Sequence, residues 1–334
     1  MLNTSNMSVV WSVAITSIKT LFITKSVNNT KLINSVRRFS ITPSSNMKLV
    51  QFVYNENPGE IRAGYLEGDK VVDINKTDCS IPSTLLEILK NGDLEKVKKL
   101  PLMKPPSIDL SSIKLAAPIH GHDKVLCIGL NYKDHCEEQN LTPPQVPLIF
   151  SKFASTVVGP KDAVKLRTDV TNKVDWEVEL TVVIGKPASR VKAKDAYKYV
   201  LGYTVAQDIS ARDWQKERNG GQFLLGKSMD TFCPIGPCIT TSDEIPDPQS
   251  LYIKCSVNGV EKQKSNTNQL VHKIPDVIER LSSVMTLLPG DILLTGTPGG
   301  VGMYRSPPEY LKPGDVIHSE IEKIGVLETR VEQL

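Results

Sequence analysis

Hydrophobic residues gather in short runs that end at glycine or proline over most of the chain. The densest run covers residues 174–184 and stops at Gly185-Lys186-Pro187, which predicts a strand. Similar runs predict strands at 124–129, 201–206, 292–295, 315–321 and 325–331, and a hairpin at 251–263 that turns at Asn258-Gly259. Residues 194–200 and 274–285 are expected to be helical. The pattern favours a strand-rich α+β fold over a doubly wound sheet.

The chain is long enough for two folded parts. Short strands at 48–53 and 70–74, a helix that opens at Ser83, and prolines at 101, 105 and 106 predict a small N-terminal α+β domain over 47–117. Residues 118–334 then form the larger domain. The residues of the small domain indicate no chemistry.

The first 46 residues differ in composition from the rest. Residues 1–55 contain no Asp or Glu, several Lys and Arg, and much Ser, Thr and Asn, which is typical of a mitochondrial transit peptide processed near Arg37-Arg38. The alternative is a tolerated, disordered extension. We expect a protein of the mitochondrial matrix, with its six cysteines as thiols. No window is apolar enough for a membrane span, and no basic cluster interleaved with aromatics suggests nucleic acid.

Two glutamates on the predicted strand at 174–184 are the first candidate for chemistry. Glu177 and Glu179 are two residues apart, so they point to the same face, while Val178, Leu180 and the next alternate residues point to the other. Adjacent carboxylates repel unless a cation or a shared proton lies between them, and Mg²⁺ binds such oxygens. The alternative is a solvated strand face.

A histidine and a glutamate follow the predicted strand at 124–129. His135 and Glu138 are three residues apart on a short helical turn, so they share a face and can form a hydrogen bond. A carboxylate that orients an imidazole is part of a general base. The alternative is an ordinary surface ion pair.

Asp208 lies where the strand at 201–206 passes into a predicted helix. Arg212 and Gln215 follow four and seven positions later, on the same face of that helix. Asp208 could complete a three-carboxylate metal site, with Arg212 and Gln215 reaching an anionic substrate. The alternative is a capped helix with an Arg–Asp pair.

Two further segments contain polar groups in apolar surroundings. Lys227 follows Gly226 in an apolar run, so it could donate a proton or pair with a carboxylate, or simply extend to solvent. The loop from Thr295 to Gly302 lacks the Gly-Lys-Ser/Thr ending of a phosphate-binding loop, so nucleotide binding is excluded. Its amides and the hydroxyls of Thr295 and Thr297 could hold a substrate carboxylate.

Together these motifs resemble the fumarylacetoacetate hydrolase family over residues 118–334. The matching segments are Gly129-Leu130-Asn131-Tyr132 with His135, Asp175-Trp176-Glu177-Val178-Glu179, Gln207-Asp208-Ile209-Ser210-Ala211-Arg212-Asp213-Trp214-Gln215, Gly226-Lys227 and Thr295-Gly296-Thr297-Pro298. The resemblance implies a mixed β-roll or sandwich with flanking helices. It also implies that Mg²⁺ or Mn²⁺ is bound by three acidic residues, namely Glu177, Glu179 and Asp208.

The resemblance also suggests roles for the other candidates. It implies that His135 and Glu138 form the base on a lid, and that Lys227, Arg212 and Gln215 contact substrate. Asn131 stands where the founding hydrolase has another carboxylate, which argues against fumarylacetoacetate as the substrate.

The branch of the family that this chain resembles carries a small N-terminal domain and a mitochondrial leader, and it is linked to oxaloacetate tautomerisation. We therefore expect an enzyme that acts on a small 2-oxo dicarboxylic acid through a metal-chelated enolate. Acylpyruvate hydrolysis and oxaloacetate decarboxylation use the same groups and stay open, as does a metal-binding scaffold with little turnover. The resemblance implies a homodimer.

Overall fold

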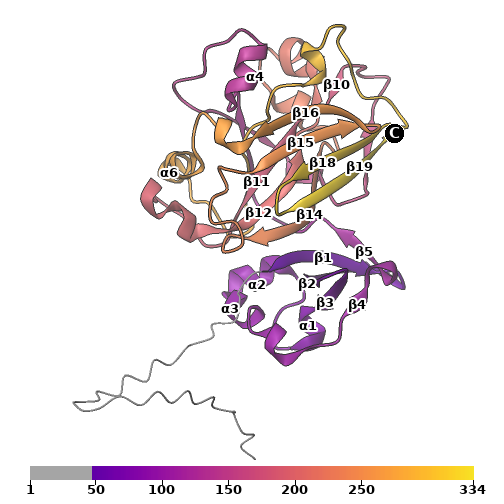
Figure 1. Ribbon diagram of the computed structural model, residues 1–334, viewed down its shortest axis with the longest axis vertical. Helices are drawn as coiled ribbons and strands as arrows, with labels where there is room; N and C mark the ends of the chain where they lie inside the picture. The colour runs from indigo at the N-terminus through magenta and orange to yellow at the C-terminus, as the bar shows by residue number, and fades with distance from the viewer. Residues whose placement is uncertain (1–46) are drawn as a thin grey trace, which may run out of the picture. The chain divides into compact units, whose positions relative to one another are not determined.

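The computed structural model describes residues 47–334, which lie within one compact unit. The predicted transit peptide, residues 1–46, lies outside the described residues. Figure 1 shows an assembly of twisted sheets with short helices at their margins. The prediction of a strand-rich α+β fold is confirmed.

The largest sheet in residues 47–334 has 12 strands, with the order β4-β3-β2-β1-β14-β12-β11-β17-β6-β7; β5 pairs with β1, and β8 pairs with β14. Most neighbours are antiparallel, but β17 is parallel to β6, and β14 is parallel to β8. Its strands are β1 (Lys48–Tyr54), β2 (Asn57–Glu67), β3 (Lys70–Asp73), β4 (Ile108–Asp109), β5 (Ile113–Ala116), β6 (Val125–Gly129), β7 (Leu148–Lys152), β8 (Val157–Val158), β11 (Val178–Ile184), β12 (Val200–Gln207), β14 (Cys233–Thr241) and β17 (Ile292–Leu294).

Two smaller sheets accompany it in the described part of the chain. One has 5 strands in the order β16-β15-β18-β19-β9, and the other is a 2-stranded pair. The first comprises β9 (Ala163–Leu166), β15 (Tyr252–Val257), β16 (Val260–Asn266), β18 (Val316–Ile321) and β19 (Gly325–Gln333), and the second comprises β10 (Val174–Asp175) and β13 (Ser210–Ala211).

The helices are short. The α-helices are α1 (Ile74–Thr77), α2 (Leu85–Asn91), α3 (Leu94–Val97), α4 (Lys133–Glu138), α5 (Leu224–Lys227) and α6 (Ile274–Val284). Turns of 3-10 helix occupy Leu100–Met103, Leu110–Ser112, Ala154–Thr156, Ala193–Tyr199, Thr267–Gln269 and Gly302–Tyr304, and Trp214–Arg218 forms one stretch of π-helix. The cap of α2 is Thr84, one residue after the predicted Ser83.

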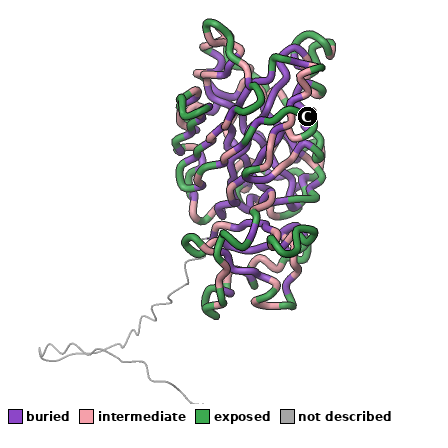
Figure 2. The backbone as a smooth tube through the Cα atoms, turned by 90° about the vertical axis from the view of Figure 1, so that its right-hand side faces the viewer, coloured by how far each residue is buried: buried purple, intermediate pink, exposed green. Residues whose placement is uncertain are grey.

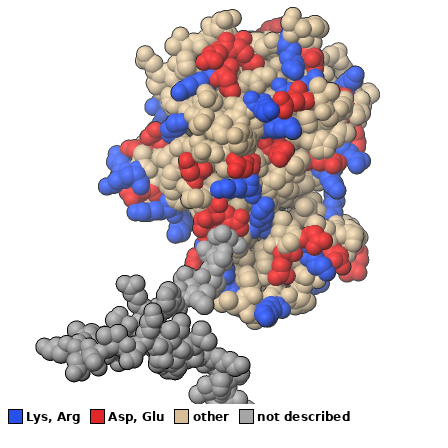
Figure 3. Space-filling view, in the orientation of Figure 1, with Lys and Arg blue, Asp and Glu red and all other residues tan. Residues whose placement is uncertain are grey.

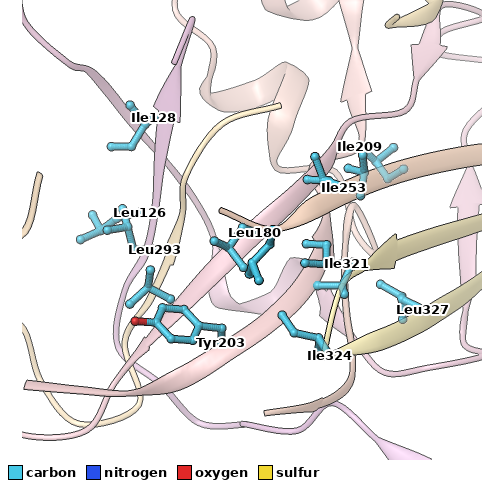
Figure 4. Close-up of a cluster of buried hydrophobic side chains, with 14 of the residues drawn as sticks. Leu126, Ile128, Leu180, Tyr203, Ile209, Ile253, Leu293, Ile321, Ile324 and Leu327 are labelled. Carbon is cyan, nitrogen blue, oxygen red and sulfur yellow. The ribbon is translucent and has the colours of Figure 1, made fainter. Parts of the chain in front are cut away.

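The main core lies between the large sheet and the five-stranded sheet. Figure 4 shows Leu180 and Tyr203 of the large sheet beside Ile253, Ile321 and Leu327 of the smaller one. Every residue of β11 is buried, and Figure 2 shows that buried backbone fills the interior while exposed segments lie at the loops. Burial of each such aliphatic side chain contributes about 1.5–3 kcal/mol. This packing fixes the backbone of β11 from both faces.

The N-terminal segment is joined to the rest by hydrogen bonds between strands. Strand β1 pairs with β14, in the register Lys48 to Thr240 and Leu49 to Ile239. The predicted boundary between residues 117 and 118 falls between β5 and β6. The division into domains stays a prediction, although strands from both sides of that boundary belong to one sheet.

The structure differs from the expected elements at two places near the candidate site. The strand at 174–184 is broken at Trp176 and Glu177, and the segment after Asp208 is not a regular helix. Ser210 and Ala211 instead pair with β10, because the backbone of Asp175 and Val174 continues beside them. Asp208 therefore lies before the helical stretch that begins at Arg212, and the prediction that it shares a helical face with Arg212 and Gln215 is wrong.

No helix within residues 47–334 is long and apolar enough to cross a membrane. On the face drawn in Figure 3, basic and acidic side chains alternate across the surface, and neither sign forms a continuous patch over the coloured residues. All six cysteines are free thiols, and only Cys79 is exposed.

Candidate active site

The three predicted carboxylates come together where β11 and β12 lie side by side. Val178 is the register partner of Gln207, so Glu177 and Asp208 occupy adjacent positions just outside the paired strands. The Asp208 amide donates to the carbonyl of Glu177 at 2.9 Å. Carboxylate oxygens of Glu177, Glu179 and Asp208 all lie within 4.8 Å of one another, and all three residues are buried.

Buried cations surround these carboxylates. Lys152 Nζ lies 2.6 Å from Asp208 Oδ1, and Lys227 Nζ lies 2.7 Å from both Glu177 Oε2 and Asp208 Oδ2. Arg212 Nη1 lies 2.7 Å from Glu177 Oε1. With Asp175, which pairs with Arg212, these groups form what we call the buried charge cluster: Lys152, Asp175, Glu177, Glu179, Asp208, Arg212 and Lys227.

The cluster has four carboxylates and three cations, so one negative charge is unbalanced. Burial raises the pKa of Glu177, but Lys227 and Arg212 outweigh it and lower the pKa to about 2. Glu179 has the opposite shift: burial, Asp208 and Glu177 raise its pKa well above the ordinary value. Within the described residues Glu179 has no cationic partner, and its Oε2 accepts only the Gly296 amide at 2.7 Å. Glu179 is therefore the carboxyl group of the cluster that lacks a balancing cation and most readily takes up a proton.

Lys227 remains protonated in this arrangement. Burial disfavours its charge, but Asp208 and Glu177 outweigh that effect and raise its pKa. The lysine consequently holds two of the three carboxylates together. The sequence left open whether Lys227 pairs with carboxylates or extends to solvent, and the structure places it in the interior.

Arg212 has one unused donor. Its Nε donates to Asp175 Oδ2 at 2.8 Å, and its Nη1 donates to Gln215 Oε1 at 2.9 Å as well as contacting Glu177. Its Nη2 is buried and has no hydrogen-bond partner in residues 47–334. An unpartnered guanidinium nitrogen in the interior is costly unless a ligand accepts its protons. This nitrogen is thus available to an anionic ligand.

The second group of polar residues lies nearer to solvent, and we call it the rim: His135, Glu138, Gln139, Lys216 and Tyr304. His135 Nδ1 lies 2.5 Å from Glu138 Oε1, and the Gln139 amide nitrogen lies 3.0 Å from His135 Nε2. Because Glu138 accepts at Nδ1, the Nε2 atom carries the lone pair and accepts from Gln139. The imidazole is buried, with 9% of its side chain exposed, against 21% for Glu138.

Hydrogen bonds extend the rim from Gln139 to the surface. The Tyr304 hydroxyl donates to Gln139 Oε1 at 2.7 Å, and Lys216 Nζ donates to the Tyr304 oxygen at 2.8 Å. This sequence of contacts fixes the orientation of the Gln139 amide, so that its nitrogen faces His135.

The glycine-rich loop from Thr295 to Met303 binds carboxylates of the protein itself. The Gly296 amide donates to Glu179, Gly300 to Glu138 Oε2 at 2.7 Å, and Gly302 to Asp175 Oδ1 at 2.7 Å. Positive φ angles of 106° at Gly296 and 102° at Gly300 favour glycine, and a side chain at Gly300 would meet the carbonyl of Lys262 at 2.2 Å. These amides are already occupied by the carboxylates that they orient.

Members of both groups line one cavity of about 100 Å³: Glu177, Glu179, Arg212 and Lys227 of the cluster, and His135, Gln139, Lys216 and Tyr304 of the rim. Phe150 and Phe223, whose ring centroids are 5.4 Å apart, belong to its apolar wall. Thr297 also lines the cavity, but its hydroxyl donates to the Val178 carbonyl at 3.0 Å and accepts from Gln263. Its side chain is therefore committed to the protein. The Thr295 hydroxyl donates to Leu180 at 2.8 Å.

The carboxylate trio fits a divalent cation. Three buried oxygen donors meet within a few ångströms, and one of them, on Glu179, has no cationic partner among the described residues. Asn131 does not join them: its amide nitrogen donates to the Thr295 carbonyl at 2.7 Å, and its oxygen accepts from the His272 amide. Of the residues that the sequence singled out, all nine candidates except Glu138 and Asp208 line the cavity, and those two contact residues that do.

Five residues of the site had no role assigned from the sequence alone. Lys152 and Asp175 complete the buried charge cluster, and Gln139, Lys216 and Tyr304 belong to the rim. Of these, Lys152 alone could have been found from the sequence, because it ends the largely apolar run that forms β7.

Comparison with known proteins defines the class. The family described as fumarylacetoacetate hydrolase, C-terminal, matches residues 124–332. The chain belongs to the fumarylacetoacetate hydrolase family, and it is an enzyme of that family. The expected family and its fold are confirmed.

Individual relatives narrow the comparison to one branch. The chain is 48% identical over 300 residues to the mitochondrial oxaloacetate tautomerase FAHD2A of Bos taurus, covering 88% of this chain and 95% of that protein. It is 42% identical over 298 residues to the fumarylacetoacetate hydrolase domain-containing protein 2 homolog of Dictyostelium discoideum, covering 85% and 97%. The predicted domain-containing protein 2 branch and mitochondrial location are confirmed.

A solved structure agrees with the fold. The fumarylacetoacetate hydrolase from psychrophilic Exiguobacterium antarcticum superposes with a TM-score of 0.77 at 34% identity, over 86% of this chain and 100% of that one.

Proposed function

We propose that this protein is a Mg²⁺- or Mn²⁺-dependent oxaloacetate tautomerase, an isomerase that converts the enol form of oxaloacetate to the keto form. One observation carries the proposal. Two members of a metal-competent carboxylate trio, Glu177 and Glu179, and a histidine oriented by Glu138 line the same small cavity. Relatives similar over most of their length are named oxaloacetate tautomerases.

Glu177, Glu179 and Asp208 would hold the metal ion. When bound, the ion supplies a Lewis acid that stabilises negative charge on substrate oxygen. Its two positive charges offset the unbalanced carboxylate and leave the cluster with a net positive charge, which favours an anionic substrate.

Arg212 binds a substrate carboxylate through Nη2, the donor without a protein partner. Gln215 holds the guanidinium by accepting from Nη1 at 2.9 Å, so it orients the donor. Thr297 shapes the cavity wall beside the metal ligands, with its hydroxyl engaged by Val178 and Gln263. Lys227 keeps Glu177 and Asp208 close together and contributes positive charge.

His135 moves the proton between the substrate oxygen and carbon C3. Its Nε2 atom has the lone pair needed to accept a proton, and Glu138 stabilises the imidazolium that results. Substrate must replace the Gln139 amide at Nε2 before the transfer. General acid–base groups of this kind contribute about 10²–10⁴-fold to rate.

The cavity supports a small substrate. Its volume of about 100 Å³ is below the roughly 150 Å³ of an engineered cavity that binds benzene. An acid of four carbons suits this size better than a bulky aryl or long acyl substrate.

Acylpyruvate hydrolysis and oxaloacetate decarboxylation are the alternatives. The same histidine, positioned by Glu138, could activate water for C–C bond cleavage, and a solved relative is called a fumarylacetoacetate hydrolase.

Purified protein with Mg²⁺ should remove the enol absorbance of oxaloacetate much faster than buffer with Mg²⁺, without release of CO₂. Glu179→Ala should abolish this activity. Absence of enol decay, together with cleavage of acetylpyruvate, would refute the tautomerase in favour of the hydrolase. Inactivity on both substrates would favour a metal-binding scaffold.

We also propose a homodimer, a transit peptide over residues 1–46, and folded domains over 47–117 and 118–334. Light scattering tests the dimer, and N-terminal sequencing of the mature protein tests the processing site near Arg37-Arg38.

A further inference from the structure

The cations that line the cavity differ in whether a carboxylate of the protein lies beside them. Arg212 contacts Asp175 and Glu177, and Lys227 contacts Glu177 and Asp208. Lys216 is the third cation in the lining. Within residues 47–334 its ammonium contacts no carboxylate closely enough for an ion pair; its hydrogen-bond partner is the neutral Tyr304 hydroxyl, at 2.8 Å. Lys216 therefore brings to the rim an ammonium group with no carboxylate partner among the described residues.

The position of Lys216 in the chain separates it from the deep end of the cavity. It is exposed, whereas Arg212, four residues earlier, is 4% exposed. Both cations line the same cavity, and their different exposure places Lys216 nearer to solvent than Arg212. If Arg212 Nη2 donates to one carboxylate of a substrate, the ammonium of Lys216 is left to donate to a second.

We propose that Lys216, positioned by Tyr304, binds the distal carboxylate of a 2-oxo dicarboxylic acid and so selects dicarboxylates over monocarboxylates. This inference rests on the proposed function, and it adds the residue that sets the substrate class. An ammonium has three donors and Tyr304 takes one, so two remain for a carboxylate. A hydrogen bond between charged groups is about twice as strong as a neutral one.

The test compares oxaloacetate with pyruvate, which is the same 2-oxo acid without the distal carboxylate. Binding of each to the Mg²⁺-loaded protein is measured by calorimetry with fresh solutions, for the unmodified protein and Lys216→Met. We expect the preference for oxaloacetate over pyruvate, the ratio of their Kd values, to fall about tenfold in Lys216→Met, as for loss of a charge-assisted hydrogen bond. Pyruvate binding should be unchanged.

Three further variants sharpen the test. Lys216→Arg should keep most of the preference, and Lys216→Glu should reduce it below that of Lys216→Met through repulsion. Lys90→Met is the matched control, because Lys90 is exposed on α2 and does not line the cavity; it should behave as the unmodified protein. The preference should also weaken as ionic strength rises, since an exposed ammonium is screened.

An unchanged Kd ratio in Lys216→Met would overturn the proposal, and so would an equal loss of affinity for both acids. The failure of the proposed function has a different signature. If the unmodified protein does not accelerate enol decay but still prefers oxaloacetate through Lys216, the subsite stands and the tautomerase does not.

Discussion

Residues of the buried charge cluster and of the rim line one cavity, yet the two groups are built in different ways. In the cluster, Lys152, Lys227 and Arg212 each contact a carboxylate within 2.8 Å, on strands and segments packed into the core. In the rim, Gln139, which follows α4, is joined to the 3-10 turn Gly302–Tyr304 by one hydrogen bond from the Tyr304 hydroxyl.

This difference indicates which groups can move during a reaction. Charges removed from water are costly to separate, so the cluster keeps its arrangement. A single neutral hydrogen bond has a net worth of only about 1 kcal/mol, so Gln139 can leave His135 when substrate arrives. The metal ligands are thus fixed and the proton-transfer group is accessible.

The largest expected effect distinguishes two carboxylates within the cluster. Glu179→Gln should abolish Mg²⁺ binding in calorimetry, an effect greater than the roughly 10–100-fold for loss of an outer-shell partner. With a chelator present, the free energy of unfolding of the Glu179→Gln variant at pH 7 should not be lower than that of the unmodified protein. Because the pKa of Glu179 is higher in the folded protein than its ordinary value of 4.5, the carboxyl group destabilises the fold only above about that pH. Any gain in unfolding free energy from Glu179→Gln should therefore vanish near pH 4.

Glu177→Gln is the matched comparison. Glu177 balances Lys227 and Arg212, so the metal-free protein should lose about 3 kcal/mol of unfolding free energy, as when one partner of a buried pair is removed. Equal stability of the two variants in urea denaturation would contradict the charge assignment.

Lys152→Met should destabilise the protein by about 3 kcal/mol, because it leaves one oxygen of a fully buried Asp208 without its cation. The same measurement on Lys152→Met combined with Asp208→Asn provides the control. The double variant should be more stable than the two single effects predict, and strict additivity would argue against a direct interaction.

His135→Asn should slow enol-oxaloacetate tautomerisation by about a hundredfold through loss of the proton-transfer group. Mg²⁺ affinity should be unchanged, since the histidine is not one of the metal-competent trio. A normal rate in stopped-flow measurements of enol absorbance would show that another residue moves the proton.

The smallest effect is expected at Gln139. Gln139→Leu removes a neutral donor from His135 Nε2, so tautomerisation should change by only about fivefold or less, corresponding to a net hydrogen bond of about 1 kcal/mol. A hundredfold loss would place Gln139 among the residues that the reaction requires, rather than among those that substrate displaces.

Residues that act through local spacing could be predicted from the sequence. The two-residue period of a strand placed Glu177 and Glu179 together, and helical spacing paired His135 with Glu138. The contact between Lys152 and Asp208 joins residues 56 apart, and that between Tyr304 and Gln139 joins residues 165 apart. Such pairs depend on which strands and loops become neighbours in the fold.

The segment after Asp208 illustrates the same limit. Its residues suggested a helix that would align Arg212 and Gln215, but pairing of Ser210 and Ala211 with β10 replaces the expected turn. Arg212 still reaches Glu177, and Gln215 still contacts Arg212. Tertiary packing therefore brings these side chains together although the backbone between Asp208 and Arg212 is not the helix that the sequence suggested.

The loop from Thr295 to Met303 positions both the metal ligands and the base. Its amides donate hydrogen bonds to Glu179 and Asp175 of the charge cluster and to Glu138 of the rim. The number of residues between these amides therefore sets the distance between the metal ligands and the base. Inserting or deleting a single residue in this loop would displace the metal ligands relative to the base. The same change in length in a distant surface turn would leave both groups in place.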